Sequence, residues 1–147
     1  MGLLTLVQAS LIIDKALEKG REKGFAPLTV AVLDAGGHLV AFKRKDRSGI
    51  LRFDIAFGKA WGALGMGFGS RTLFERSNNT PIFFTALAAA SSGRLVPNPG
   101  GVLIKDAGGD ILGAVGISGD TSDKDEVCAI AGVEAAGLKP DPGGSKA

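Results

Sequence analysis

The spacing of apolar residues along the chain predicts five helices. In residues 3–23, Leu6, Ile13 and Leu17 share one face of a helix and charged residues occupy the other. Ser122 followed by Asp125 approximates a capping box, which marks the start of the last helix. This last helix is predicted at residues 122–136, and the remaining three at residues 50–66, 70–76 and 82–91.

Short runs of β-branched and other apolar residues predict the strands. Residues 28–34 are nearly all apolar, which is typical of a strand covered on both faces. The sequence Asp-Ala-Gly-Gly comes at the end of this run, and its glycines suit a tight hairpin turn leading into residues 38–44. The same four residues separate predicted strands at 102–106 and 111–118. The chain therefore contains two similar hairpins, each followed by a helix, and a further strand is predicted at residues 94–97.

This order of elements predicts the α+β class, with a short antiparallel sheet flanked by helices. A chain of 147 residues suits one domain, which we place at residues 1–138. Residues 139–147 are mostly proline, glycine, serine and charged residues, so they are predicted to form a flexible C-terminal tail. The small residues of segment 50–66 favour a close helix contact, including one between subunits.

Composition and charge exclude several classes of protein. A net charge of +2, one tryptophan and no tyrosine argue against nucleic-acid binding. The chain has no run of about 20 apolar residues to span a membrane, and its first residues lack the basic segment of a signal peptide. The single Cys128 cannot form an internal disulfide, which fits a reducing compartment. We therefore expect a cytoplasmic protein with neither nucleic acid nor membrane as partner, and Cys128 in the core.

Two titratable residues are candidates for acid–base chemistry. His38 is the only histidine, so a metal site built from several histidines is excluded. His38 can act as a ligand or a general acid or base, or it can be a half-exposed strand residue without a role. Lys59 lies in a mostly apolar helix, where it extends its ammonium to solvent, pairs with Asp125 or Glu126, or serves a site with a lowered pKa.

Other candidates point to an anionic ligand. A cationic cluster surrounds the end of the first hairpin, and its arginines can hold carboxylates or haem propionates unless the cluster is simply a solvated turn. Its members are Lys43, Arg44, Lys45, Arg47 and Arg52. Ser70 follows a glycine-rich break, and with the amides of the helix start it can face an anion. The acidic residues at 120–126 lack EF-hand spacing and are predicted to cap the last helix.

Three blocks of sequence carry a family resemblance. The first runs from Val32 to Phe42 and continues with Arg44-Lys45-Asp46, the second joins Ile55-Ala56 to Lys59-Ala60, and the third contains Gly100-Gly101, Gly113–Gly119 and Asp125-Glu126. Together they resemble the family of GlcG proteins from glycolate operons, HbpS-type haem-binding proteins and the C-terminal domain of PduO cobalamin adenosyltransferases. Lys45 and Leu103 depart from the family pattern, which usually has methionine and proline there.

The resemblance implies a five-stranded antiparallel sheet between helices, similar to profilin-like and roadblock-like domains. It also implies homo-oligomers, up to octamers. Some members bind haem, and others are encoded in bacterial operons for glycolate or diol catabolism. Ser70 lies near the position where HbpS-type proteins place a haem-ligating threonine.

We therefore predict a protein that forms homo-oligomers and binds a small anionic ligand, with haem as the leading candidate. The predicted pocket lies between the second helix and the sheet and is lined by His38, Arg44, Arg52, Lys59 and Ser70, with no separate metal site. The alternative is a lyase or isomerase acting on a small carboxylate or aromatic acid. In that enzyme Lys59 or His38 is the acid–base group and Arg52 holds the carboxylate. A third possibility is an assembly module without a ligand.

Overall fold

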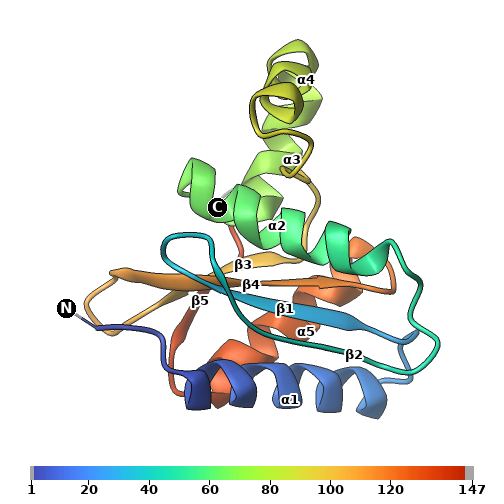
Figure 1. Cartoon of the computed structure of the whole chain (residues 1–147), viewed down its shortest axis with the longest axis vertical. Helices are drawn as coiled ribbons and strands as arrows, with labels where there is room; N and C mark the ends of the chain where they lie inside the picture. Colours follow the sequence, from blue (N-terminus) through green and yellow to red (C-terminus); the bar gives the residue numbers. More distant parts are fainter. Residues whose placement is uncertain (1, 145–147) are drawn as a thin grey trace.

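A five-stranded antiparallel sheet forms the centre of the protein (Figure 1). The structure is a computed structural model and describes residues 2–144. The strand order is β2-β1-β4-β3-β5. The strands are β1 (Thr29–Asp34), β2 (Leu39–Arg44), β3 (Gly101–Lys105), β4 (Ile111–Ser118) and β5 (Lys139–Asp141). The predicted α+β class with a five-stranded antiparallel sheet is confirmed.

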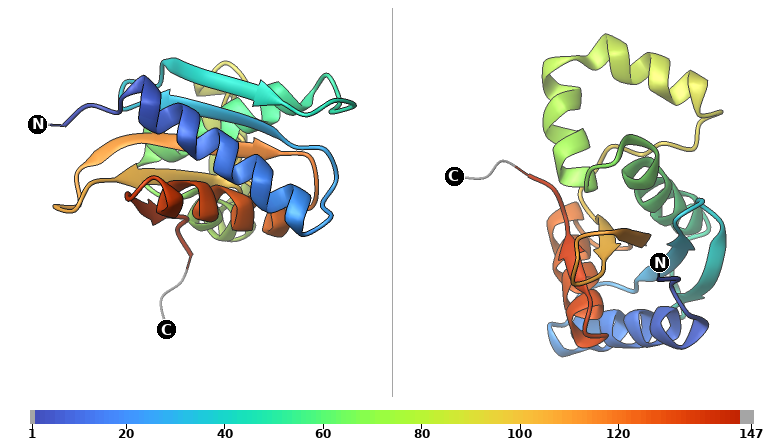
Figure 2. Two further views of the ribbon diagram at one scale, coloured as in Figure 1. Left: turned by 90° about the horizontal axis from the view of Figure 1, so that it is seen from below. Right: turned by 90° about the vertical axis from the view of Figure 1, so that its left-hand side faces the viewer.

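Helices cover both faces of the sheet. The antiparallel helices α1 (Leu6–Glu22) and α5 (Ser122–Ala135) lie side by side on one face, and α2 (Arg52–Met66) lies across the other (Figures 1 and 2). The helices α3 (Ser70–Asn79) and α4 (Pro81–Ala90) extend beyond α2 and away from the sheet. We call this pair the arm. None of the helices within residues 2–144 is long and apolar enough to cross a membrane.

The alternation of side chains along β1 divides the core into two layers. Val30 and Val32 contribute to the larger core, which α1 and α5 cover, and Leu33 contributes to the core beneath α2. Because both faces are covered, β1 is almost entirely buried, as its apolar sequence predicts. The edge strand β2 is largely exposed and carries more polar residues.

Helix α2 lies unusually close to the sheet because glycines face it. A Cβ at Gly116 would meet the carbonyl oxygen of Ala56, and one at Gly101 would meet that of Lys59. On its other side, the backbone N–H of Val96 donates a hydrogen bond to the carbonyl oxygen of Gly58 (3.2 Å). The small residues of this helix thus contact other parts of the same chain.

The prediction of a strand at residues 94–97 is wrong. This segment crosses α2 at Gly58, where the missing side chain leaves room for it, and does not join the sheet. The fifth strand is instead β5, which pairs with β3. Residues 139–141 of the predicted flexible tail are therefore a strand. The N–H of Gly144 also donates to the Thr72 hydroxyl (2.8 Å), so the ordered chain continues along α3. Residues 145–147 of the predicted tail lie outside the described residues.

The two Asp-Ala-Gly-Gly sequences form similar turns, as predicted. Asp34 Oδ1 accepts the N–H of Gly36 at 2.9 Å and that of His38 at 3.0 Å. In the second hairpin, Asp106 Oδ1 accepts the N–H of Asp110 at 2.9 Å. In each turn the second glycine has a positive φ, 83° and 90° respectively, which a residue with a side chain rarely adopts.

The start of the last helix differs in detail from the prediction. Thr121, not Ser122, is the N-cap, and its hydroxyl accepts the N–H of Lys124. Asp125 does not cap through the predicted box, because its side chain turns into the interior.

Candidate functional site

The five predicted binding residues do not line one pocket. His38 follows the turn at one end of the β1–β2 hairpin, and Arg44 lies exposed at the other end, opposite Thr29. Six strand residues span about 20 Å, which is too far for both side chains to line one small pocket. Lys59 and Ser70 are buried along α2 and at the start of α3. Arg52, half-buried at the start of α2, donates to the Ser118 hydroxyl at 3.0 Å.

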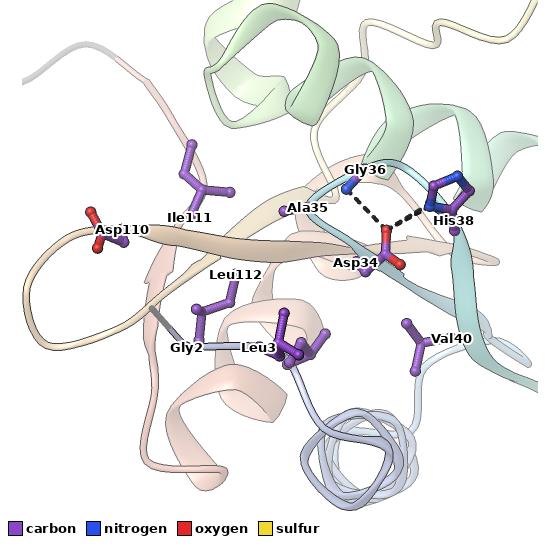
Figure 3. Close-up of a pocket in the computed structure, with 11 residues that line it drawn as sticks. Gly2, Leu3, Asp34, Ala35, Gly36, His38, Val40, Asp110, Ile111 and Leu112 are labelled. Atoms are coloured by element: carbon purple, nitrogen blue, oxygen red, sulfur yellow. Dashed lines mark hydrogen bonds and ion pairs between the residues drawn. The ribbon is translucent and has the colours of Figure 1, made fainter.

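A hollow of about 750 Å³ opens at the turn end of the sheet (Figure 3). It is bounded by the N-terminal segment and by both Asp-Ala-Gly-Gly hairpins. Its walls are mostly apolar and include Leu3, Leu4, Val40, Ile111 and Leu112. Its side-chain polar groups come from Asp34, His38 and Asp110. Small-ligand sites usually have volumes of roughly 300–1,000 Å³ and this kind of lining.

Asp34 orients His38 at the rim of this hollow. The imidazole Nδ1 lies 3.2 Å from Asp34 Oδ1, and the His38 side chain is 80% exposed. Hydrogen bonds from backbone N–H groups, above all that of His38, lower the pKa of Asp34, so its carboxylate is charged at neutral pH. A carboxylate on Nδ1 favours the tautomer with the proton there and leaves Nε2 as the free lone pair. Within residues 2–144, Nε2 has no hydrogen-bond partner.

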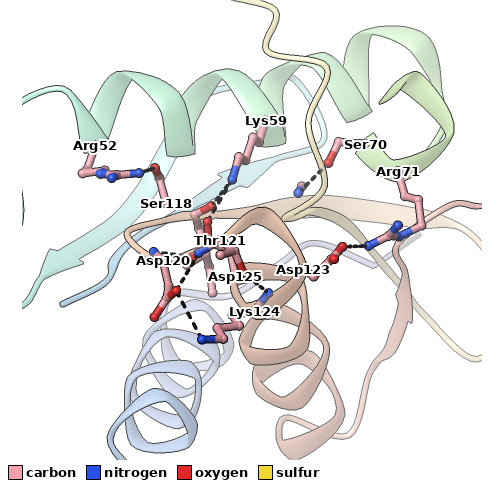
Figure 4. A network of polar contacts seen from close by, with 12 residues as sticks. Arg52, Lys59, Ser70, Arg71, Ser118, Asp120, Thr121, Asp123, Lys124 and Asp125 are labelled. Carbon is pink, nitrogen blue, oxygen red and sulfur yellow. Dashed lines mark hydrogen bonds and ion pairs between the residues drawn. The ribbon is translucent and has the colours of Figure 1, made fainter. Parts of the chain in front are cut away.

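A second polar cluster is buried between α2, β4 and α5 (Figure 4). Lys59 Nζ lies 3.1 Å from Asp125 Oδ2 and donates to the carbonyl oxygen of Ile117 at 2.8 Å. The other carboxylate oxygen of Asp125 accepts the N–H of Asp120 at 3.0 Å. The two side chains are only 3% and 1% exposed. Of the three interpretations of Lys59, this geometry favours pairing with an acid.

Burial and mutual attraction act in opposite directions on this ion pair. Burial lowers the pKa of Lys59, and the charge of Asp125 opposes that change. Burial also raises the pKa of Asp125, and the charge of Lys59 opposes it. Each charge is therefore retained in the interior because the other is present.

Ser70 does not present its hydroxyl to a ligand. The side chain is fully buried, and its Oγ accepts the backbone N–H of Gly101 at 2.7 Å, where β3 begins. This bond attaches the start of α3 to the sheet. Ser70 is therefore a structural residue in this arrangement, not part of the hollow.

Arg71 joins the arm to the body of the protein and was not foreseen from the sequence. Its Nε donates to both carboxylate oxygens of Glu126 (3.1 and 3.0 Å), and its Nη2 donates to Asp123. The sequence indicates only that these acids favour the start of α5. Because Arg71 lies 55 positions from Glu126, no local pattern points to the pairing.

Cys128 is buried in the core, as predicted. Burial raises the pKa of its thiol to about 11, so the reactive thiolate is scarce at neutral pH. Cys128 is not a candidate nucleophile.

The fold and the hollow define the class of protein: an α+β sandwich with an open, largely apolar ligand-sized hollow at the hairpin end of its sheet. The chain belongs to the family described as haem degrading protein HbpS-like, whose model matches residues 4–134. The family predicted from the sequence blocks is thereby confirmed. No protein with a curated description matches the chain in sequence.

Solved structures with the same fold include three informative examples. The PduOC:heme complex is 22% identical, with a TM-score of 0.84 over 93% of this chain and 97% of that one. Protein ORFY of Klebsiella pneumoniae is 24% identical, with a TM-score of 0.81 over 90% of each chain. A double mutant of Streptomyces reticuli HbpS is 25% identical, with a TM-score of 0.77 over 91% of this chain and 87% of that one. At these identities the likeness establishes the fold.

Proposed function

We propose that this protein binds haem in the hollow at the hairpin end of the sheet, with His38 Nε2 as the ligand to the iron. The observation that carries the proposal is the Asp34–His38 pair at the edge of the apolar hollow. Histidines that bind metals commonly donate their other ring N–H to a carboxylate, which fixes the ring and raises its basicity. The family description and the haem complex of a protein with this fold support the same ligand.

The residues of the hollow fit part of the haem molecule. One imidazole nitrogen suits the iron, and the apolar walls suit the faces of the porphyrin. The carboxylates of Asp34 and Asp110 do not suit the propionates, so we place the propionates toward the open side. Haem held in this way supplies a redox-active iron. The protein contributes the imidazole, its orientation by Asp34 and an apolar surface.

The predicted cationic ligands Arg44 and Arg52 do not line the hollow. Arg44 and Arg52 belong to the opposite end of the sheet, where Thr29 of β1 pairs with both Arg44 and Ser118. The enzyme alternative is also less well supported, since the ammonium of Lys59 is buried and already bonded to Ile117 and Asp125.

Titration with haemin tests the proposal directly. We expect a shifted Soret band at one equivalent of haemin per chain. His38→Ala removes the ligand to the iron and should weaken binding by more than about 100-fold. Asp34→Asn should weaken it less, by roughly the 10–100-fold typical of outer-shell partners, and should change the spectrum of the bound iron.

Two further variants locate the site. Leu3→Lys adds a charge at a lining residue that is 82% exposed, so it should impair binding without unfolding the protein. Arg44→Ala is the matched control and should leave binding unchanged. Binding that survives His38→Ala and Leu3→Lys but is lost in Arg44→Ala would contradict the proposed location. Absence of any Soret shift would refute haem as the ligand.

A further inference from the structure

A second hollow, of about 230 Å³, lies at the end of the sheet opposite the Asp-Ala-Gly-Gly turns, and we call it the α1 hollow. It is formed by the last turns of α1, by residues 24–28 that lead into β1, and by the residue that follows β2. Its walls are mostly apolar, and two cationic side chains complete them. The larger apolar residues are Leu17, Phe25, Pro27 and Leu28, and the cations are Arg21 and Lys45.

The alternation of side chains along β2 turns Lys45 toward α1. Lys43, two positions earlier, forms an ion pair with Asp14 of α1 at 2.8 Å. Alternate residues of a strand lie on the same face of a sheet, and the N–H of Lys45 continues the strand pairing by donating to the carbonyl oxygen of Leu28 at 2.9 Å. Arg21 lies seven positions beyond Asp14, about two turns of α1, and so on the same side of the helix. Lys43 therefore faces an acid on α1, whereas Lys45 shares its hollow with a second cation.

No acidic side chain compensates these two cations. Within residues 2–144, neither Arg21 nor Lys45 forms an ion pair or a side-chain hydrogen bond. Nearby carboxylates are bonded elsewhere, because Glu18 pairs with Lys15 at 3.1 Å and Asp120 accepts two backbone N–H groups, each at 2.7 Å. Two like charges at one hollow repel each other, and an anion bound between them removes that repulsion.

The carbonyl groups at the end of α1 do not take the place of this anion. The carbonyl oxygen of Gly20 accepts the N–H of Phe25 at 2.9 Å, and that of Arg21 accepts the N–H of Gly24 at 3.2 Å. Gly24 has a φ of 69°, so the helix ends in the usual way, with a glycine in the left-handed region. These carbonyls are therefore bonded within the chain, and the two cationic side chains are left for a ligand.

The apolar lining selects the kind of anion. Arginine and lysine bind carboxylate and phosphate alike, so their charge does not distinguish the two. A phosphate ion has no apolar surface to place against Leu17 and the half-buried ring of Phe25, whereas a hydrocarbon body removes both from water. The volume of about 230 Å³ lies below the roughly 300–1,000 Å³ of sites for drug-sized ligands. The occupant is therefore a small molecule.

We propose that the α1 hollow binds a small monocarboxylate with an aromatic or branched apolar body. Arg21 and Lys45 hold the carboxylate, and Leu17 and Phe25 pack against the body. The proposal does not depend on haem, because the α1 hollow and the hollow beside His38 lie at opposite ends of the sheet.

Titration with benzoate, followed through the backbone amide signals of ¹⁵N-labelled protein, tests the proposal. We expect a Kd on the order of 1 mM or below, as suits a ligand of so few atoms, and the largest shifts at residues 20–28 and 45. Benzamide keeps the ring without the charge, and inorganic phosphate keeps a charge without the ring. Each should bind at least about tenfold more weakly than benzoate, since each loses one of the two kinds of contact.

Substitutions of the two cations test their role. Lys45→Met and Arg21→Gln should each weaken benzoate binding by about tenfold, and Lys45→Arg, which keeps the charge, should preserve it. Lys23→Met is the matched control, because it makes the same change in net charge at an exposed lysine that does not line the hollow. It should leave binding unchanged. Thermal unfolding establishes that each variant is folded.

Several results would overturn the proposal. They are no binding of benzoate at several times the expected Kd, unchanged binding by Lys45→Met, and equal losses in Lys45→Met and Lys23→Met. Equal binding of benzamide would show that the cations are not used, and equal binding of phosphate would show that the apolar walls are not used. Shifts confined to the hollow beside His38 would refute the location. None of these results bears on haem, which the titration with haemin tests separately.

Discussion

Replacing Lys59 by methionine removes the positive partner of a buried carboxylate and keeps a side chain of similar length. Asp125 is 1% exposed, and its ion pair with Lys59 is 3.1 Å long. Removal of one partner of a buried pair typically costs about 3–5 kcal/mol, because the other charge remains without compensation. For a chain of this size, that loss lowers the Tm by roughly 10 °C or more.

The loss depends on pH in a definite direction. Burial raises the pKa of Asp125 in the folded protein, and Lys59 opposes that rise, so Lys59→Met should raise the pKa of Asp125 further. The folded state then binds a proton more tightly than the unfolded chain, where the pKa is about 3.9. The penalty is therefore full above the folded pKa of Asp125 and disappears as the pH falls toward the unfolded value. Acidification should bring the stabilities of variant and wild type closer together.

Urea unfolding of variant and wild type, from neutral pH down to the unfolded pKa of about 3.9, measures the difference in their free energies of unfolding. Lys15→Met is the matched control, because Lys15 forms an exposed pair with Glu18 at a similar 3.1 Å and should cost at most about 1 kcal/mol. The double substitution Lys59→Met and Asp125→Leu should recover most of the loss. A cost of Lys59→Met no larger than that of Lys15→Met, or a penalty that grows as the pH falls, would show that Asp125 does not remain as an uncompensated buried charge.

Two further outcomes follow from the packing. Gly116→Ala should lower the free energy of unfolding in urea by about 2 kcal/mol or more, because its Cβ would meet the carbonyl oxygen of Ala56. Gly108→Ala, in an exposed turn with room for a Cβ, should change it by less than about 0.5 kcal/mol, and equal effects would contradict the close approach of α2. Cys128, buried and with a pKa of about 11, should react with iodoacetamide only as the protein unfolds. Rapid modification of the native protein would show that the thiol is accessible.

Much of the fold could be predicted because its signals are local. The turn after β1 depends on Asp34, whose carboxylate bonds to N–H groups only two and four positions away. The apolar sequence of β1 likewise reports that both its faces are covered. Such patterns lie within a few residues, so they can be recognised in the sequence without knowledge of what packs against them.

Elements that depend on distant partners were predicted incorrectly. Residues 94–97 have a β-like sequence, but Gly58 on α2 provides the partner for the N–H of Val96. The C-terminal segment looks like a tail, yet Asp141 pairs with Lys105 at 2.7 Å across 36 positions of sequence. Five strands were expected and five are present in residues 2–144, with a different fifth member.

The residues of the candidate site could likewise be predicted only in part. By itself the sequence determined which residue types were available, a single histidine and a lysine that needed an acidic partner, and it indicated the family. Only the tertiary structure decided that His38 belongs to the apolar hollow with Asp34, that Lys59 is enclosed with Asp125, and that Arg44 lies at the far end of the sheet. The physical reason is that side-chain chemistry and short-range periodicity are written in the order of residues. Which side chains come together in one site depends instead on strand register and on helix packing between segments far apart in the chain.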